Sequence, residues 1–261
     1  MATTRPRPQS RTRPRSLGRV SARVTWLGHS TVGIELDGTV LVTDPVLRRR
    51  IAHLRRDVSA TAPPRPDAVL LSHLHYDHLD LPSLKRIGRN VRLIAPRGAR
   101  RHLRGFTTID EVEPGATLEV GGVRVDVVEA VHDGRRWPVG KAIPALGFVL
   151  RGSRSIYFAG DTDLFDGMAA LAPLDVALVP VAGWGPKVGP GHMDPRGAAE
   201  ALALLRPSIA VPIHWGTYGI VLRGVRGDRT PAEQFVREAA EVAPDVEVRI
   251  LSEGGSFDLD P

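Results

Sequence analysis

The chain has 261 residues, of which 42% are hydrophobic and 25% charged, a composition typical of a folded protein with a substantial buried core. It contains no cysteine, so disulfide bonds and thiolate metal sites are excluded, and any metal ion must be held by histidine or carboxylate side chains. The formal net charge is +6, which raises the question of nucleic acid as a partner.

The positive charge is confined to an amino-terminal tail, residues 1–20. This segment carries six arginines and no acidic residue, so residues 21–261 are neutral overall, which argues against nucleic acid as a partner. Because the tail is rich in proline and poor in apolar residues, we expect it to be disordered and residues 21–261 to form one domain. The tail lacks the hydrophobic segment of a secretory signal, and no apolar run approaches the ~18 residues of a membrane-spanning helix. We therefore expect a cytoplasmic protein.

After the tail, short β-rich runs alternate with turn signals. Strands are expected over residues 23–27, 31–36, 39–43, 68–71 and 91–95. A hairpin turn at Asp37 and Gly38 joins the second and third of these strands. Asp80 is expected to cap a helix over residues 81–87, and the basic residues 97–104 are expected to form a second helix.

The remainder of the chain repeats this alternation of strands and helices. Strands are expected over residues 117–120, 123–131, 146–151, 155–159, 209–212 and 246–251. Asp194, followed by a proline, predicts the start of a helix over residues 196–205, and a capping box at Thr230 precedes a helix over residues 234–242. Since no low-complexity linker separates the two halves, the pattern predicts one α/β domain with two sheets packed face to face and helices outside.

A dense group of metal-binding residue types follows the buried strand at residues 68–71. The run H-x-H-x-D-H consists of His73, His75, Asp77 and His78. Chance would produce it in about one of a thousand chains of this composition. Alternate side chains at a strand end leave the same face, so His73 and His75 can meet one ion. Asp77 and His78, past the bend, can reach a second ion, and the run therefore predicts a binuclear metal site rather than a solvated polar turn.

This run resembles the H-x-H-x-D-H motif of the metallo-β-lactamase superfamily, and three later residues resemble the rest of that family's pattern. His132, at the end of a long strand, resembles the third histidine of the first metal site. Asp161, in a Gly-Asp-Thr sequence, resembles the carboxylate between the ions, and His214, in a Pro-Ile-His-Trp-Gly sequence, resembles the last ligand of the second site. Each is a weak signal alone, and their order on successive strand ends supports the assignment.

The resemblance implies a four-layer αβ/βα sandwich, the metallo-β-lactamase fold, with two mixed β-sheets face to face and helices outside. The implied first metal site consists of His73, His75 and His132, and the second of Asp77, His78 and His214, with Asp161 between the ions. Two divalent cations are expected, with Zn²⁺ preferred and Mn²⁺ or Fe²⁺ as alternatives, because the ligands are nitrogen and carboxylate. A hydroxide held by both ions would attack a small ester, lactone or phosphodiester.

Four further segments make the resemblance more specific. They are residues 26–31, 41–45, 191–195 and 212–217, with the sequences WLGHST, LVTDP, GHMDP and PIHWGT. Together they resemble the branch that contains N-acylphosphatidylethanolamine-hydrolysing phospholipase D and L-ascorbate-6-phosphate lactonase. That branch implies a phosphodiester or lactone substrate ahead of a β-lactam, and hence a small-molecule partner that is anionic or carries a phosphate group.

Residues beside the predicted ligands are candidates for supporting roles. Asp44, which ends a strand before a proline, is interpreted as orienting a ligand histidine. His29 is either a buried hydrogen-bonding residue or part of the active-site floor. His192 lies in a loop just before a helix and is a candidate catalytic residue, together with Asp77, that contacts the substrate.

Two arginines are further candidates for a role at the site, and two other functions are alternatives to the one above. Arg135 and Arg136 follow His132 closely, where they are either solvated or hold a phosphate or carboxylate group. A nuclease of the same fold is an alternative against which the neutral domain argues. A catalytically degenerate metal-binding sensor or scaffold is another, against which the complete ligand set argues.

Overall fold

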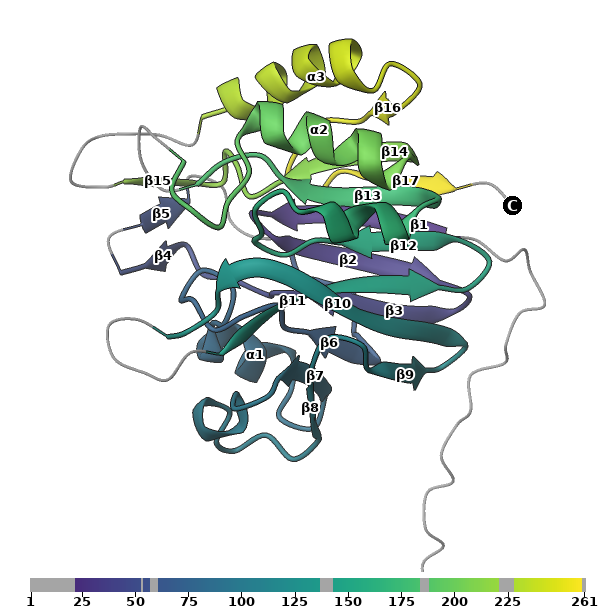
Figure 1. Ribbon diagram of the computed structural model, residues 1–261. Coiled ribbons are helices and arrows are strands. Elements are labelled where there is room, and N and C mark those ends of the chain that lie inside the picture. Colours follow the sequence, from purple (N-terminus) through teal and green to yellow (C-terminus); the bar gives the residue numbers. More distant parts are fainter. Residues whose placement is uncertain are drawn as a thin grey trace, which may run out of the picture.

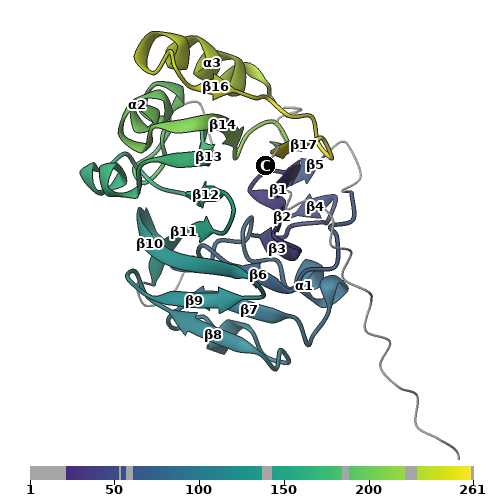
Figure 2. The same ribbon diagram turned by 90° about the vertical axis from the view of Figure 1, so that its right-hand side faces the viewer.

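The computed structural model describes residues 22–52, 54–56, 61–136, 143–183, 188–220 and 228–259. The expected disorder of the tail, residues 1–20, lies outside these residues. Two seven-stranded sheets face each other, and helices cover the outer faces (Figure 1; Figure 2). This arrangement is the predicted four-layer sandwich. None of the helices in the described ranges is long and apolar enough to span a membrane.

The first sheet has the strand order β17-β1-β2-β3-β6-β7-β8. Its strands are β1 Ala22–Gly28, β2 Thr31–Leu36, β3 Thr39–Thr43, β6 Ala68–Leu70, β7 Arg92–Pro96, β8 Ile109–Val112 and β17 Ser256–Leu259. The half from β17 to β3 is antiparallel, and the half from β3 to β8 is parallel. Parallel neighbours need a crossover, and helix α1, Leu81–Ile87, lies in the connection from β6 to β7. As predicted, the Asp80 side chain caps α1 by accepting a hydrogen bond from the Ser83 backbone N–H.

The second sheet has the strand order β16-β14-β13-β12-β11-β10-β9. Its strands are β9 Thr117–Val120, β10 Val123–Asp133, β11 Pro144–Arg151, β12 Ser155–Phe158, β13 Leu174–Pro180, β14 Pro207–Ile213 and β16 Glu247–Val248. Strands β9 to β12 are antiparallel and β12 to β16 parallel. Helix α2, Pro195–Leu205, connects β13 to β14, and α3, Thr230–Val242, lies beside α2 on the outside (Figure 2).

The apolar core is divided by the first sheet. Leu70 of β6 belongs to the main core between the two sheets, which also contains Phe148 of β11. Val69 and Leu71 belong instead to a second core with Leu84 of α1. Because successive side chains of a strand point to opposite faces, a strand covered on both sides must be continuously apolar, as β6 is.

Three predicted elements differ in the structure. The helix expected over residues 97–104 is reduced to a 3-10 turn, η1, Arg100–His102, because Gly98 adopts a φ of 92° that a right-handed helix excludes. The strand expected over residues 246–251 is only the short β16. The capping box at Thr230 is wrong, since the helix already includes this residue and its hydroxyl donates to the Asp228 carboxylate over 2.7 Å.

Several elements were not predicted. They are β8, β13, β17, the 3-10 helix η2 Asp166–Leu171, and a three-stranded sheet of β4 Arg50–Ile51, β5 Leu54–Arg56 and β15 Tyr218–Ile220. The most central of these is β13, which is continuously apolar and buried from Val176 onward and lacks the alternation that marks a half-buried strand. It lies between β12 and β14, which carry predicted ligands at their ends.

Candidate metal centre

The predicted ligands meet at one edge of the sandwich because they follow strands of both sheets. The H-x-H-x-D-H run follows β6 of the first sheet. In the second sheet, His132 lies at the end of β10, Asp161 follows β12 and His214 follows β14. His214 has a φ of 61°, so the chain turns sharply as it leaves the strand.

His73, His75 and His132 form a first group of imidazole rings. Nε2 of His73 lies 3.0 Å from Nδ1 of His75, which lies 3.2 Å from Nε2 of His132. The His132 ring is oriented by its Nδ1–H, which donates to the Gly191 carbonyl over 2.8 Å. Two nitrogens bound to one tetrahedral ion at about 2.0–2.1 Å are ~3.3 Å apart, so this spacing fits a single ion.

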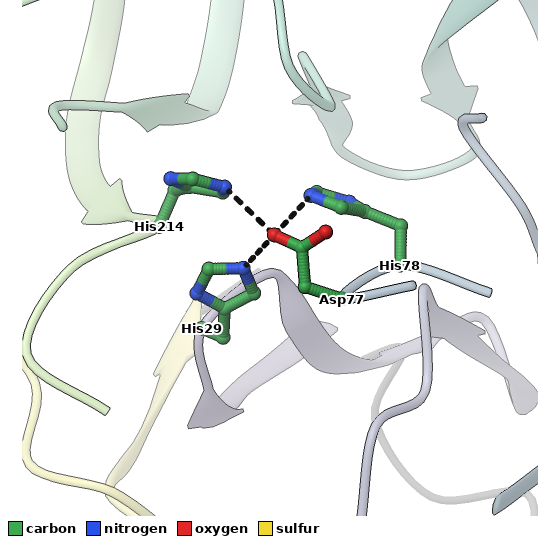
Figure 3. Close-up of side chains that lie close together, drawn as sticks. All are labelled: His29, Asp77, His78 and His214. Carbon is green, nitrogen blue, oxygen red and sulfur yellow. Dashed lines mark hydrogen bonds and ion pairs between the residues drawn. The ribbon is translucent and has the colours of Figure 1, made fainter. Parts of the chain in front are cut away.

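Asp77, His78 and His214 form a second group (Figure 3). Oδ2 of Asp77 lies 3.6 Å from Nε2 of His78 and 3.5 Å from Nε2 of His214. Nδ1 of His214 donates to the Ala182 carbonyl over 2.8 Å, which turns Nε2 toward the group. The same Asp77 oxygen lies 3.0 Å from Nε2 of His29, at the end of β1.

The Asp161 carboxylate lies between the two groups. Its Oδ2 is 3.1 Å from Nε2 of His78 and 3.2 Å from Nε2 of His214 in the second group. It is also 3.8 Å from Nε2 of His73 in the first group. One carboxylate oxygen therefore faces imidazole nitrogens of both groups.

Asp44 orients ligands of both groups through hydrogen bonds, directly or by way of Ser72. The sequence suggested this role for a single ligand histidine. This fully buried carboxylate follows β3 and accepts a hydrogen bond of 2.8 Å from Nδ1 of His78. It also accepts hydrogen bonds from the backbone N–H of Ser72 over 2.8 Å and from the Ser72 hydroxyl. The Ser72 oxygen in turn lies 2.9 Å from Nδ1 of His73. Sequence reasoning missed Ser72, for which the only signal was its place between a buried strand and the first histidine.

His29 is a buried hydrogen-bonding residue that contacts the second group directly. Its ring lies 4.1 Å from that of His214 between centroids, and its carbonyl accepts a hydrogen bond of 3.1 Å from the His214 backbone N–H. Burial, together with the neighbouring His214, lowers the pKa of His29 to about 4. The ring is therefore neutral, and its Nε2–H donates to Asp77.

The electrostatics of the two groups differ in the metal-free protein. In the first group, burial lowers the pKa of His132 to about 4 and that of His73 well below its ordinary value. In the second group, burial opposes protonation, but attraction by Asp161 outweighs it and raises the pKa of His214 to about 9. The pKa of His78 is raised for the same reason. Protonation is therefore favoured in the His78 and His214 rings, which lie against carboxylates, and disfavoured in the rings of the first group.

The residues present fit divalent ions. The buried Oδ1 of Asp161 has no hydrogen-bond partner among the described residues, although an unpaired buried carboxylate oxygen is costly. An ion in each group would lie on either side of this carboxylate. Three nitrogen donors in one group, and two nitrogens with a carboxylate in the other, are donor sets typical of zinc and of similar transition metals.

His192, Arg135 and Arg136 each contact other residues in the structure. Nε2 of His192 lies 3.3 Å from Oδ2 of Asp161, and its side chain is partly exposed. Arg135 forms an exposed ion pair with Asp133. Arg136 uses its Nη1 to donate to two backbone carbonyls, so neither arginine is simply solvated.

The comparisons with known proteins agree with this geometry. A family model described as "Beta-lactamase superfamily domain" matches residues 39–215, more than half of the chain. The chain belongs to this superfamily. A UPF0173 metal-dependent hydrolase of Methanopyrus kandleri is 33% identical over 247 residues, which cover 90% of this chain and 99% of that protein.

Two further comparisons concern a relative in sequence and a solved structure of similar fold. The N-acyl-phosphatidylethanolamine-hydrolyzing phospholipase D 1 of Caenorhabditis elegans is 30% identical over 226 residues, 74% of this chain and 64% of that protein. The solved structure of Igni18, a metallo hydrolase of Ignicoccus hospitalis, has a TM-score of 0.71 at 23% identity and covers 92% of this chain and 99% of that one. This chain, a member of the superfamily, is a metal-dependent hydrolase with a histidine and aspartate cluster able to bind metal.

Proposed function

We propose that this hydrolase binds two divalent ions and cleaves a small ester, lactone or phosphodiester. The proposal rests chiefly on Oδ2 of Asp161, which lies within 3.2 Å of nitrogens in the second group and 3.8 Å from Nε2 of His73 in the first. A carboxylate shared in this way can hold two cations close together, because its negative charge offsets their repulsion.

The ligand assignment follows the two groups. His73, His75 and His132 hold the first ion, and Asp77, His78 and His214 hold the second, with Asp161 between them. When bound, such ions generate a nucleophile from water at neutral pH and polarise the scissile C=O or P=O bond. Zinc is the first choice, and manganese or iron(II) would suit the same donors.

Two residues are assigned to the substrate and the attacking water. Asp77, held by Nε2–H of His29, accepts a hydrogen bond from the water and orients it. His192 donates a proton from Nε2 to the leaving oxygen of the substrate. Its partly exposed side chain lies against Asp161, and its buried Nδ1 makes no hydrogen bond within the described ranges.

A phosphodiester is the preferred substrate class. The phospholipase D of Caenorhabditis elegans, at 30% identity, acts by name on a phosphatidylethanolamine derivative, and phosphodiesters suit the same hydrolytic chemistry. A lactone or carboxylic ester is the alternative that this chemistry also permits.

The test is metal removal and restoration with a set of substrates. The purified protein, stripped with a chelator and reloaded with Zn²⁺, Mn²⁺ or Fe²⁺, is assayed with bis(p-nitrophenyl) phosphate, a p-nitrophenyl ester and a chromogenic lactone. We expect turnover of at least one substrate to disappear on stripping and to return on reloading. Turnover that survives complete metal removal would contradict the proposal.

A further inference from the structure

We infer that Arg136 is a positioning residue that holds the ligand-bearing loop, residues 75–78, in the geometry needed to bind metal. The inference rests on the ligand assignment proposed above, because this loop contains His75, Asp77 and His78. No motif in the sequence pointed to this role.

Arg136 contacts the loop at both of its ends. Its Nη1 donates to the carbonyl of Leu74 over 2.9 Å and to that of Leu79 over 3.1 Å. These two residues immediately precede and follow the loop, and both are fully buried. Buried carbonyls need a donor, and a guanidinium donor makes a stronger hydrogen bond than a neutral one. A single nitrogen therefore fixes the distance between the two ends.

Arg136 also contacts the middle of the loop. Its guanidinium carbon lies 4.0 Å from the centroid of the Tyr76 ring, which places the cation over the aromatic face. Tyr76 stands between His75 and Asp77 and is 51% exposed, so few other contacts can restrain it. The stacked guanidinium restrains the residue that links a ligand of the first group to a ligand of the second.

The loop itself is a single turn that closes on one carbonyl. The backbone N–H groups of His78 and Leu79 both donate to the His75 carbonyl, over 3.1 and 2.8 Å. The Leu74 N–H donates to the Gly134 carbonyl over 3.1 Å, so the segment that carries Arg136 is tied to the loop through its backbone as well. A side chain at Gly134 would lie 2.7 Å from the Ile143 carbonyl oxygen, which shows how tightly this segment is packed.

The neighbouring arginine provides a matched control. Arg135 forms an ion pair with Asp133, and about half of each side chain is exposed. Replacing either arginine removes one positive charge beside His132, but only Arg136 contacts the loop. Lysine at position 136 would keep the charge but lose the planar group that donates to two carbonyls while it stacks on a ring.

The test measures the affinity for Zn²⁺ by competition with a chromophoric chelator, which needs no substrate. Wild type, Arg136→Ala, Arg136→Lys and Arg135→Ala are compared, and Arg136→Ala is also measured with millimolar methylguanidine. Loss of a residue that orients ligands lowers metal affinity by about 10- to 100-fold. We expect a loss of this size in Arg136→Ala, a smaller loss in Arg136→Lys and none in Arg135→Ala. Methylguanidine should restore much of the affinity.

The outcomes separate this inference from the proposed function. Wild type that binds no zinc would contradict the proposed function itself. Wild type that binds zinc while Arg136→Ala stays within about threefold of Arg135→Ala would overturn the inference alone. A loss that methylguanidine leaves unchanged would assign the effect to general destabilisation and would also overturn it. Should Arg136→Ala fail to fold, affinity in Arg136→Lys equal to that of wild type overturns the inference, and a loss supports it.

Discussion

In His78, His132 and His214, the imidazole nitrogen that faces away from the proposed ion is hydrogen-bonded. Nδ1 of His132 donates to the Gly191 carbonyl, Nδ1 of His214 to the Ala182 carbonyl, and Nδ1 of His78 to Asp44. Because a carbonyl can only accept, the contacts of His132 and His214 place a proton on Nδ1. The Nε2 lone pair is then available to a metal, in His214 once the second ring proton has been lost. The orientation of the ligands is thus established before any ion binds.

Asp44 is the residue whose loss should affect both groups. In Asp44→Asn, one oxygen that accepts hydrogen bonds becomes an amide that donates, and it must face either the Ser72 N–H or Nδ1 of His78. We expect zinc affinity to fall by about 10- to 100-fold. Competition with a chelator measures this. Asp110→Asn, which breaks only a surface pair with Arg92, is the control. Equal affinities in the two variants would show that Asp44 does not orient ligands.

His192 should separate metal binding from substrate handling. We expect His192→Ala to retain both ions, because each group has its ligands without it, and to reduce kcat by roughly 10²-fold or more, as loss of a proton-transfer group does. Metal content and kcat are measured on the same preparation. Loss of an ion would mean that His192 is an additional ligand. Full retention of both properties would make it an ordinary loop residue.

Metal binding should release protons. In the metal-free protein, His214 has a pKa of about 9, so near neutral pH the ring is protonated and must lose its proton before it can bind an ion. His132, with a pKa of about 4, is already neutral there. The affinity of the second group should therefore weaken as pH falls below about 9, while the first group keeps its affinity until the pH approaches about 4. Calorimetric titrations in buffers of different ionisation enthalpy measure the release, and heats that do not depend on the buffer would contradict it.

At the scale of elements, contacts between aromatic rings and backbone hold the ends of β1 and β14 together beside the second group. The Trp26 and Trp215 rings are stacked with centroids 4.8 Å apart, and Trp26 Nε1–H donates to the His29 carbonyl over 2.8 Å. His29 and His214 both adopt positive φ, of 53° and 61°. These contacts connect the two sheets at the site, and they explain why a tryptophan accompanies the histidine in both sequence segments.

The end of β12 offers a stability test. Gly160, just before Asp161, has a φ of 64°, and an added Cβ would lie 2.7 Å from Cβ of Ser72 and 3.0 Å from the Leu146 carbonyl oxygen. Gly38 also has a positive φ, of 76°, but nothing lies within 4 Å of its added Cβ. Both alanine variants incur the backbone strain, and only Gly160→Ala adds a clash worth about 1–3 kcal/mol.

Urea unfolding of the metal-free variants gives the difference in unfolding free energy. We expect Gly160→Ala to be less stable than Gly38→Ala by about the cost of that clash, 1–3 kcal/mol. Equal stabilities would mean that the packing around Gly160 can relax, and that Asp161 is held less firmly than the geometry indicates.

The sequence predicted most of the elements that have a periodic pattern or a cap, and also the continuously apolar strand β6. Asp80 and Asp194 were correctly identified as helix caps. An apolar run without alternation does not distinguish a strand from a buried helix, and of two such segments β6 was predicted and β13 was missed. Supporting contacts were harder still. Ser72 and Arg136 contact residues that are distant in sequence, Asp44 and Leu74, and no local pattern marks such a contact.

At the scale of the whole molecule, the fold brings together ligands from opposite ends of the chain. His73 follows strand β6 of the first sheet, and His214 follows strand β14 of the second. They meet only because the two sheets pack face to face. The resemblance to a superfamily anticipated this architecture, and the family match over residues 39–215 confirms it. Composition alone could exclude thiolate ligands but could not place any ligand in space.

The most direct test of the binuclear centre is a titration of the metal-free protein with Zn²⁺, following bound metal by elemental analysis and turnover on the same samples. We predict saturation near two ions per chain, because two ligand groups lie on either side of one carboxylate. Asp161→Asn keeps the shape of that side chain but loses the negative charge that offsets the repulsion between two cations. This variant should therefore bind fewer ions and lose turnover. Saturation at one ion per chain, with full turnover, would contradict the account.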